Sequence, residues 1–284
     1  MSDDDRFTFT ASDGSTIAAR HWPADGETRR VLIVAHGMGE HGARYREPLA
    51  PLSRAGVTVY APDHRGHGAT APDGTHGDFG PGGFAALVDD LAVLARRAAA
   101  EHPGVPMVLL GHSMGSFAAQ AFATRHGDLI DGLALSGSAA LEALLPRMAE
   151  GGGLEAFNAA FEPARTPFDW LSRDEGAVDR YLADRWCGFS VDAAGQMSMA
   201  AMAPQMADVA ALPAGLPVYI LSGLDDPLAA AIEPLIARYR AAGAAVTTDL
   251  YPGGRHEMLN ETNRDEVVAD LLAWLDRVVG RAAR

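Results

Sequence analysis

Apolar and polar residues follow two alternating patterns along most of the chain. Short apolar runs of strand length are followed by longer stretches in which apolar residues recur at helical spacing. The patterns predict strands at 31–35, 57–61, 105–110, 129–135, 218–222 and 245–251, and helices at 45–55, 84–101, 114–126, 228–242 and 265–279. Strands that alternate with helices indicate βαβ units, so the sequence predicts an α/β fold with a mostly parallel central sheet flanked by helices.

Two segments depart from this alternation. Near the start of the chain, strand-like runs at 7–10 and 15–22 flank Asp13 and Gly14, which predicts a hairpin with an Asp-Gly turn. After the strand expected at 129–135 the pattern becomes helical and irregular, and it then returns to alternation. The expected divisions are a first core half, an inserted helical cap or lid, and a second core half, at 1–138, 139–211 and 212–284.

The composition narrows the choice of partners. The 284 residues are 48% apolar, which is enough to bury a large core. The formal net charge is −14, and the sequence contains no lysine. Because nucleic acids and anionic membrane surfaces bind clustered positive charge, this acidity argues against both as partners.

The sequence also shows no sign of export or membrane insertion. Its first residues are acidic without an apolar stretch, and no apolar run is long enough to span a bilayer. The single cysteine, Cys187, cannot form an intramolecular disulfide, which fits a reducing compartment. We expect a cytoplasmic protein without integral membrane association, and the oligomeric state stays open.

The stretch LLGHSMGS places Ser113 between Gly111 and Gly115, after an expected strand and before an expected helix. This arrangement fits G-x-S-x-G, in which a sharp strand-to-helix turn exposes the serine hydroxyl at the edge of the sheet. The two glycines remove side chains that would clash in such a turn. We therefore predict that Ser113 is a nucleophile; the alternative is a serine that only caps the helix.

A nucleophilic serine needs a base and an acid that orients the base. In this arrangement the chain order is serine, then acid, then histidine, and only His256 follows His126. The acid is expected after the preceding strand, where Asp225 and Asp226 are candidates. We favour Asp226, because Pro227 restricts the backbone that follows it, and we expect Asp225 to be a turn residue. The alternative for His256 is an ordinary surface histidine.

Acyl transfer also needs hydrogen-bond donors for the oxyanion. One expected donor is the backbone N–H of Met114, the residue after the serine. The second is expected from the glycine-rich loop at 35–42, where Met38 N–H is the candidate. Each such donor stabilises the transition state by about 3 kcal/mol. The alternative for this loop is an ordinary glycine-rich turn.

Several motifs together resemble one branch of a known superfamily. They are HGMGEH at 36–41, Arg44 with Tyr45, DHRGHG at 63–68 and GHSMG at 111–115. This set resembles the monoacylglycerol lipase and lysophospholipase-like branch of the α/β-hydrolases, also described as serine aminopeptidase S33 or hydrolase 4. The resemblance covers about 31–135 and 218–261.

The resemblance implies an α/β-hydrolase fold with a helical cap. It also implies a catalytic triad of Ser113, Asp226 and His256, with Met38 and Met114 as oxyanion donors. The chain departs from the family pattern at Ser116, where glycine is frequent, and in the cap, which does not resemble that of animal monoacylglycerol lipases. The cap sets substrate choice, so the resemblance is least informative about the substrate.

The cap supplies apolar candidates for substrate binding, namely Phe157, Phe161, Trp170, Met197 and Met202. Methionine and aromatic side chains suit an adaptable wall around an acyl chain. The alternative is that these residues form the core of the cap itself. No cluster of basic residues in the cap indicates a phosphate site, which favours neutral esters.

Histidines around the first two motifs raise the question of a metal. The group comprises His36, His41, Asp63, His64 and His67, but no further ligand pair with metal spacing follows them. We therefore expect no metal and no cofactor, and we interpret 63–68 as a structural turn. Within it, we predict that Arg65 pairs with Glu257.

These observations predict a serine hydrolase that acts on small-molecule carboxylic esters. The expected substrates carry an apolar acyl chain, as monoacylglycerols and lysophospholipids do, and the expected route is an acyl-enzyme intermediate. The alternatives are another acyl hydrolase with the same triad, such as a thioesterase, a lactonase or an aminopeptidase, or a ligand-binding protein that keeps the fold without catalysis.

Overall fold

The predicted strands assemble into one eight-stranded sheet in the order β1-β2-β4-β3-β5-β6-β7-β8. The computed structural model describes residues 5–148, 154–278 and 280. The strands are β1 (Arg6–Thr10), β2 (Thr16–Trp22), β3 (Arg30–Ala35), β4 (Val57–Pro62), β5 (Met107–His112), β6 (Gly132–Ser136), β7 (Pro217–Gly223) and β8 (Ala245–Tyr251). From β4 to β8 all neighbours are parallel, whereas β1 and β2 form the predicted antiparallel hairpin at one edge.

Helices connect the parallel strands, as the alternation predicts, and a last helix follows β8. They are α1 (Arg46–Leu49), α2 (Pro51–Arg54), α3 (Gly83–Glu101), α4 (Met114–His126), α5 (Leu141–Met148), α6 (Glu175–Ala183), α7 (Ala193–Ala201), α8 (Ala203–Ala207), α9 (Ile232–Ala241) and α10 (Arg264–Leu275). The helical stretch expected at 45–55 is present as two short helices, because α2 starts anew at Pro51. Proline lacks the N–H that would continue a helix, and it suits the first helical position.

The central strands β3 to β7 are buried on both faces, as their continuous apolar runs predict. On β3, Val31 and Ile33 pack into a cluster with α3, α4 and α9, whereas Leu32 and Val34 pack into a second cluster with α1, α2 and α10. All four side chains are at most 1% exposed. Alternate residues of a strand point to opposite faces, so the central strands β3 to β7 each supply both clusters.

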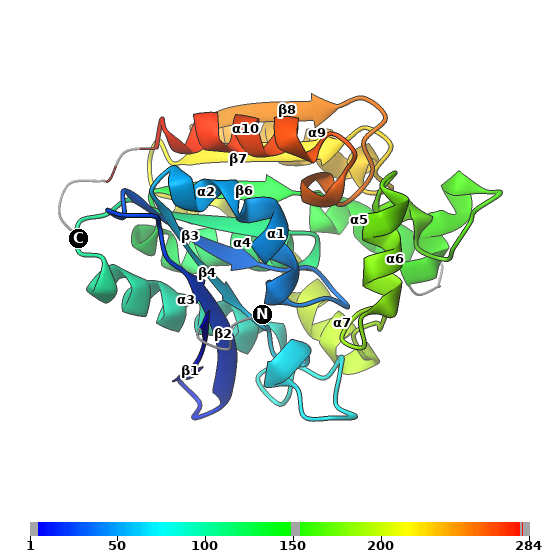
Figure 1. Cartoon of the computed structure of the whole chain (residues 1–284), viewed down its shortest axis with the longest axis horizontal. Coiled ribbons are helices and arrows are strands. Elements are labelled where there is room, and N and C mark those ends of the chain that lie inside the picture. Colours follow the sequence, from blue (N-terminus) through cyan, green and yellow to red (C-terminus); the bar gives the residue numbers. More distant parts are fainter. Residues whose placement is uncertain (1–4, 149–153, 279, 281–284) are drawn as a thin grey trace.

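The chain between β6 and β7 forms the helical insertion, which includes α5 to α8. Figure 1 shows α5, α6 and α7 beyond the carboxyl ends of the parallel strands, to the right of the sheet. Part of the insertion has its own apolar cluster, which includes Phe168, Trp170, Leu171, Val178 and Tyr181. The insertion lies where the cap is expected, and its division from the core at 139 and 211 stays a prediction. None of the helices in the described residues combines the length and apolar character that a membrane crossing needs.

Candidate active site

Ser113 lies in the sharp turn between β5 and α4. Its backbone angles are φ 53° and ψ −122°, and it is the one non-glycine residue of positive φ in the described part of the chain. A Cβ atom on Gly111 would lie 2.4 Å from the carbonyl oxygen of Gly115, and one on Gly115 would lie 2.0 Å from that of Ala35. The turn therefore requires both glycines, and it leaves Ser113 half-buried at the carboxyl edge of the sheet.

His256 and Asp226 meet at the same edge. Asp226 follows β7, and His256 follows the neighbouring strand β8. The Nδ1 atom of His256 lies 2.9 Å from Oδ2 of Asp226, and both residues are nearly inaccessible to solvent. Oδ1 of Asp226 accepts a hydrogen bond from Leu228 N–H, which fixes the carboxylate. Asp225 is exposed in the turn, as expected of a turn residue.

This geometry favours a His256 ring whose second nitrogen is free to take a proton. Donation from Nδ1 to the carboxylate leaves Nε2 as the acceptor, and Nε2 has no hydrogen-bond partner within the described residues. Burial opposes the charged form of the ring, but Asp226 outweighs this effect and raises the pKa of His256 above 6.5. In contrast, burial and the nearby His256 lower the pKa of His112 to about 4, so His112 is neutral at neutral pH.

The glycine-rich loop after β3 lies directly against Ser113. A Cβ atom on Gly37 would lie 3.2 Å from the Cβ atom of Ser113. Among the backbone hydrogen bonds of the described turns and loops, none is donated by Met38 or Met114, which is consistent with two donors left for an oxyanion. Met38 also lines the pocket in front of Ser113.

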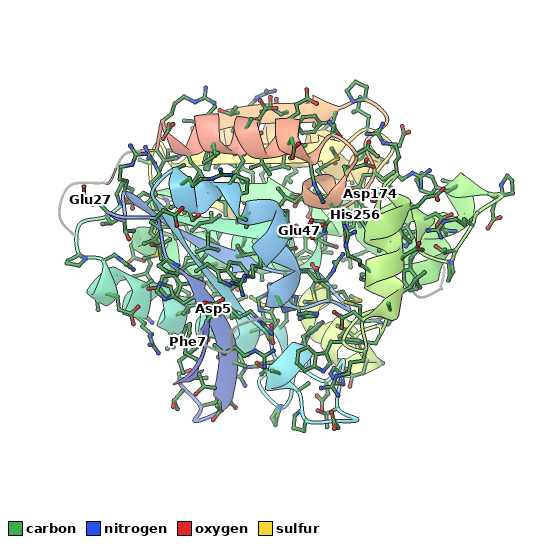
Figure 2. The ribbon with its side chains drawn as sticks, in the orientation of Figure 1. Asp5, Phe7, Glu27, Glu47, Asp174 and His256 are labelled. Atoms are coloured by element: carbon green, nitrogen blue, oxygen red, sulfur yellow. The ribbon has the colours of Figure 1, made fainter. Side chains whose placement is uncertain are left out.

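One small pocket joins these groups. Its cavity volume is about 10 Å³, which is room for about one water molecule. Its walls are formed by Gly37, Met38, Glu40, His112, Ser113, Trp170, Leu171, Tyr181, His256 and Glu257. Figure 2 shows His256 at the border between the sheet and the helical insertion. The Trp170 ring lies 4.7 Å from the His256 ring, so the insertion covers the pocket.

Of the five cap residues predicted to bind substrate, only Trp170 lines this pocket. Phe157 packs behind Trp170, with 5.0 Å between the ring centres, and Phe161 lies under the Arg255 guanidinium. Met202 is buried in the core cluster that includes α3 and α4, whereas Met197 is 67% exposed.

Sequence reasoning missed an ionic cluster of Glu40, Arg44 and Glu257 at the pocket wall. Arg44 donates to Glu40 over 2.6 Å and to both oxygens of Glu257 over 2.7 Å. The prediction that Arg65 pairs with Glu257 is therefore wrong. Arg65 instead binds Asp90 and Asp13, because its turn faces α3 and the β1–β2 hairpin. The only signal in the sequence was that Glu40 and Arg44 belong to the resembling motifs.

One group of side chains among the described residues has the spacing of a metal site. His41, Asp184 and Cys187 offer three potential ligand atoms there, all within 4.8 Å of one another. His41 already pairs with Asp184 over 2.9 Å, and burial raises the pKa of the Cys187 thiol, which disfavours the thiolate that binds metals. The other histidines of the first two motifs make different contacts; for example, His36 accepts a hydrogen bond from His64 N–H.

The sheet order, the serine turn and the acid–histidine pair together define an α/β-hydrolase. The chain belongs to the family described as serine aminopeptidase S33 (Hydrolase_4), which it matches over residues 26–263, and within that family to the monoacylglycerol lipase-like branch.

Relatives with known names support this placement. The chain is 30% identical to a monoacylglycerol lipase of Mycolicibacterium smegmatis, over 94% of this chain and 95% of that protein. It is also similar to the structure of a thermostable carboxyl esterase from Bacillus coagulans in complex with glycerol, with a TM-score of 0.84, 28% identity and coverage of 96% and 98% of the two chains. A monoglyceride lipase from Saccharomyces cerevisiae shares the fold, with a TM-score of 0.76, 21% identity and coverage of 97% and 96%. The chain is accordingly a carboxylic-ester hydrolase.

Proposed function

We propose that this hydrolase cleaves esters with an apolar acyl chain through an acyl-enzyme on Ser113. The observation that carries the proposal is the shared pocket of Ser113 and His256, with Asp226 fixed behind the histidine. A nucleophile, a base and a group that orients the base are the parts that acyl transfer needs. The two candidate N–H donors beside Ser113 support the same chemistry.

In the proposed first step, Ser113 Oγ attacks the ester carbonyl while Nε2 of His256 takes the hydroxyl proton. The N–H groups of Met38 and Met114 bind the oxyanion of the tetrahedral intermediate. Collapse of this intermediate releases the alcohol, which receives the proton from His256. In the second half, His256 takes a proton from a water molecule that attacks the acyl-enzyme, and it returns this proton to Ser113 Oγ as the acid leaves.

The charges of the pocket favour a neutral head group. Glu40 and Glu257 line the pocket, and Arg44 is the guanidinium that pairs with both. Two carboxylates and one guanidinium sum to one net negative charge, which repels the phosphate of a lysophospholipid. A monoacylglycerol-like ester, whose alcohol is uncharged, therefore fits better. The name of the Mycolicibacterium relative supports this substrate class.

An aminopeptidase would use acidic groups to bind the substrate amine, and the pocket does contain two carboxylates. However, their oxygens are already engaged. Glu40 accepts from Gly37 N–H, Tyr45 and Arg44, while Glu257 accepts two bonds from Arg44. This saturation favours ester substrates over peptides with a free amine.

The cavity volume of the pocket is too small for the substrate as the side chains now lie. A cavity that holds about one water molecule cannot hold an acyl chain. The side chains of Trp170, Leu171 and Tyr181 form the cap side of the pocket, so some of them must move when an ester binds.

Hydrolysis of p-nitrophenyl esters from acetate to palmitate tests the proposal, with Ser113→Ala alongside and amino-acid p-nitroanilides for comparison. We expect a clear optimum of chain length, loss of nearly all activity in Ser113→Ala, and no turnover of the anilides. An activity that survives in Ser113→Ala, or wild-type enzyme that cleaves only the anilides, would reject it. Labelling of Ser113 by a fluorophosphonate separates a catalytic serine from a ligand-binding protein.

A further inference from the structure

We propose that Arg44 is a positioning residue that fixes the two catalytic loops relative to each other beneath the cap. One loop carries the oxyanion donor Met38, and the other carries His256. The inference rests on the proposed function, and it concerns how the site is held rather than which atoms react.

The first contact of Arg44 reaches the oxyanion loop through Glu40. Glu40 is 3% exposed and accepts hydrogen bonds over 2.5 Å from Gly37 N–H and over 2.8 Å from the Tyr45 hydroxyl. Its other oxygen accepts from Arg44 over 2.6 Å. The carboxylate thereby fixes the peptide between His36 and Gly37, one residue before the peptide that carries Met38 N–H, and Arg44 fixes the carboxylate.

The second contact reaches the histidine loop through Glu257. Arg44 donates from Nη1 and Nη2 to the two oxygens of Glu257, each over 2.7 Å. This planar, two-point pair sets the orientation as well as the distance of its partner. Glu257 directly follows His256, so the pair restrains the backbone from which the base projects.

The third contact reaches the cap. The Arg44 guanidinium lies 4.8 Å from the centre of the Tyr181 ring on α6. On the other side of the histidine loop, Glu257 N–H donates to the carbonyl of Leu171 over 2.7 Å, and His256 N–H donates to that of Trp170. The cap is therefore bonded to the same loop that Arg44 holds.

The chemistry of this cluster requires arginine rather than lysine. Burial opposes the charge of Arg44, but the carboxylates of Glu257 and Glu40 outweigh burial and raise its pKa, so the guanidinium stays protonated. Lysine would keep the charge, but an ammonium cannot bind both Glu257 oxygens in one plane while also reaching Glu40.

The test compares Arg44→Lys with Arg65→Lys. Arg65 is the matched control because it is also buried and also binds a carboxylate, that of Asp90, through two nitrogens. Its carboxylate partners, Asp90 and Asp13, do not line the pocket, whereas those of Arg44 do. Both substitutions should lower the melting temperature. A positioning role predicts that only Arg44→Lys lowers kcat, on the order of 10²-fold, with little change in KM. Equal kcat in the two variants overturns the inference.

A second variant, Glu257→Gln, is tested by the pH dependence of kcat/KM, which a purely structural role of the cluster would leave unchanged. The charged or titratable groups that face His256 are Asp226, His112, Glu257 and Glu40. Removing the Glu257 charge disfavours the protonated His256 ring, so the acid limb of kcat/KM should move to lower pH. An unmoved acid limb counts against the coupling of this cluster to the base.

Failure of the proposed function can be distinguished from failure of the positioning role of Arg44. The pKa of His256 is measured by NMR in a Ser113→Ala background, with and without Glu257→Gln, and this measurement needs no turnover. If the wild type cleaves no ester, the proposed function fails, while a lowered pKa of His256 still supports the coupling. If esters are cleaved but Arg44→Lys matches Arg65→Lys, only the positioning role fails.

Discussion

Replacing Ser113 by glycine should make the protein more stable than replacing it by alanine. Both changes remove the hydroxyl, so their difference isolates the backbone. At φ 53° and ψ −122° a residue with a Cβ atom costs about 1–3 kcal/mol in strain, which glycine avoids. Glycine loses about 0.5–1 kcal/mol through its greater freedom when unfolded. The free energy of unfolding of Ser113→Gly should therefore exceed that of Ser113→Ala by roughly 1 kcal/mol.

Ser116 provides the matched control for this comparison. It lies one turn further along α4, and its hydroxyl bonds to Ser113 O and Ser138 are lost in either variant. In a regular helix glycine is about 1 kcal/mol less favourable than alanine, so the order at Ser116 should be reversed. Urea denaturation of all four variants gives the two differences. A glycine variant less stable than the alanine variant at both positions would refute strain at Ser113.

Three further predictions concern the base His256, the turn at Ser113 and the buried histidines. Because the pKa of His256 is raised above 6.5, kcat/KM should fall as the pH drops through a midpoint above 6.5, and a rate that stays flat to about pH 5 contradicts its role as base. Gly115→Ala places a Cβ atom 2.0 Å from the carbonyl oxygen of Ala35, so urea denaturation should show a loss of about 3 kcal/mol or more; wild-type stability would mean that the turn is not tightly packed. Burial lowers the pKa of His64 to about 3 and that of His67 to about 4, so the unfolded state binds more protons below pH 6.5. The free energy of unfolding should then fall by about 1.5 kcal/mol per histidine between pH 6.5 and about pH 5, and His67→Gln should reduce this slope.

The parts of the site that the sequence predicts are those fixed by local backbone geometry. The turn at Ser113 cannot form without glycine at two nearby positions, so its pattern is visible in the chain. Asp226 and His256 each follow an apolar strand, and parallel neighbours bring such strand ends together. Their hydrogen bond is consistent with the expectation, and their catalytic roles stay predictions.

The contacts that depend on packing between distant segments could not be predicted in this way. Arg44 and Glu257 are 213 positions apart, and nothing in the spacing of 37 acidic residues singles out Glu257 as its partner. In the cap, short broken helices give no long apolar period, so Met197 and Met202 could not be told apart. One is 67% exposed and the other 8%.

In the proposed mechanism, ester cleavage passes through an acyl group on Ser113. This group can be sought by rapid acid quenching during turnover of a monoacylglycerol, followed by mass spectrometry of the peptide that contains Ser113. The mechanism predicts a mass increase equal to the acyl group less one hydrogen, on Ser113 alone and absent in Ser113→Ala. Steady turnover with an unmodified Ser113, or an acyl group on another residue that forms at the rate of turnover, would contradict it.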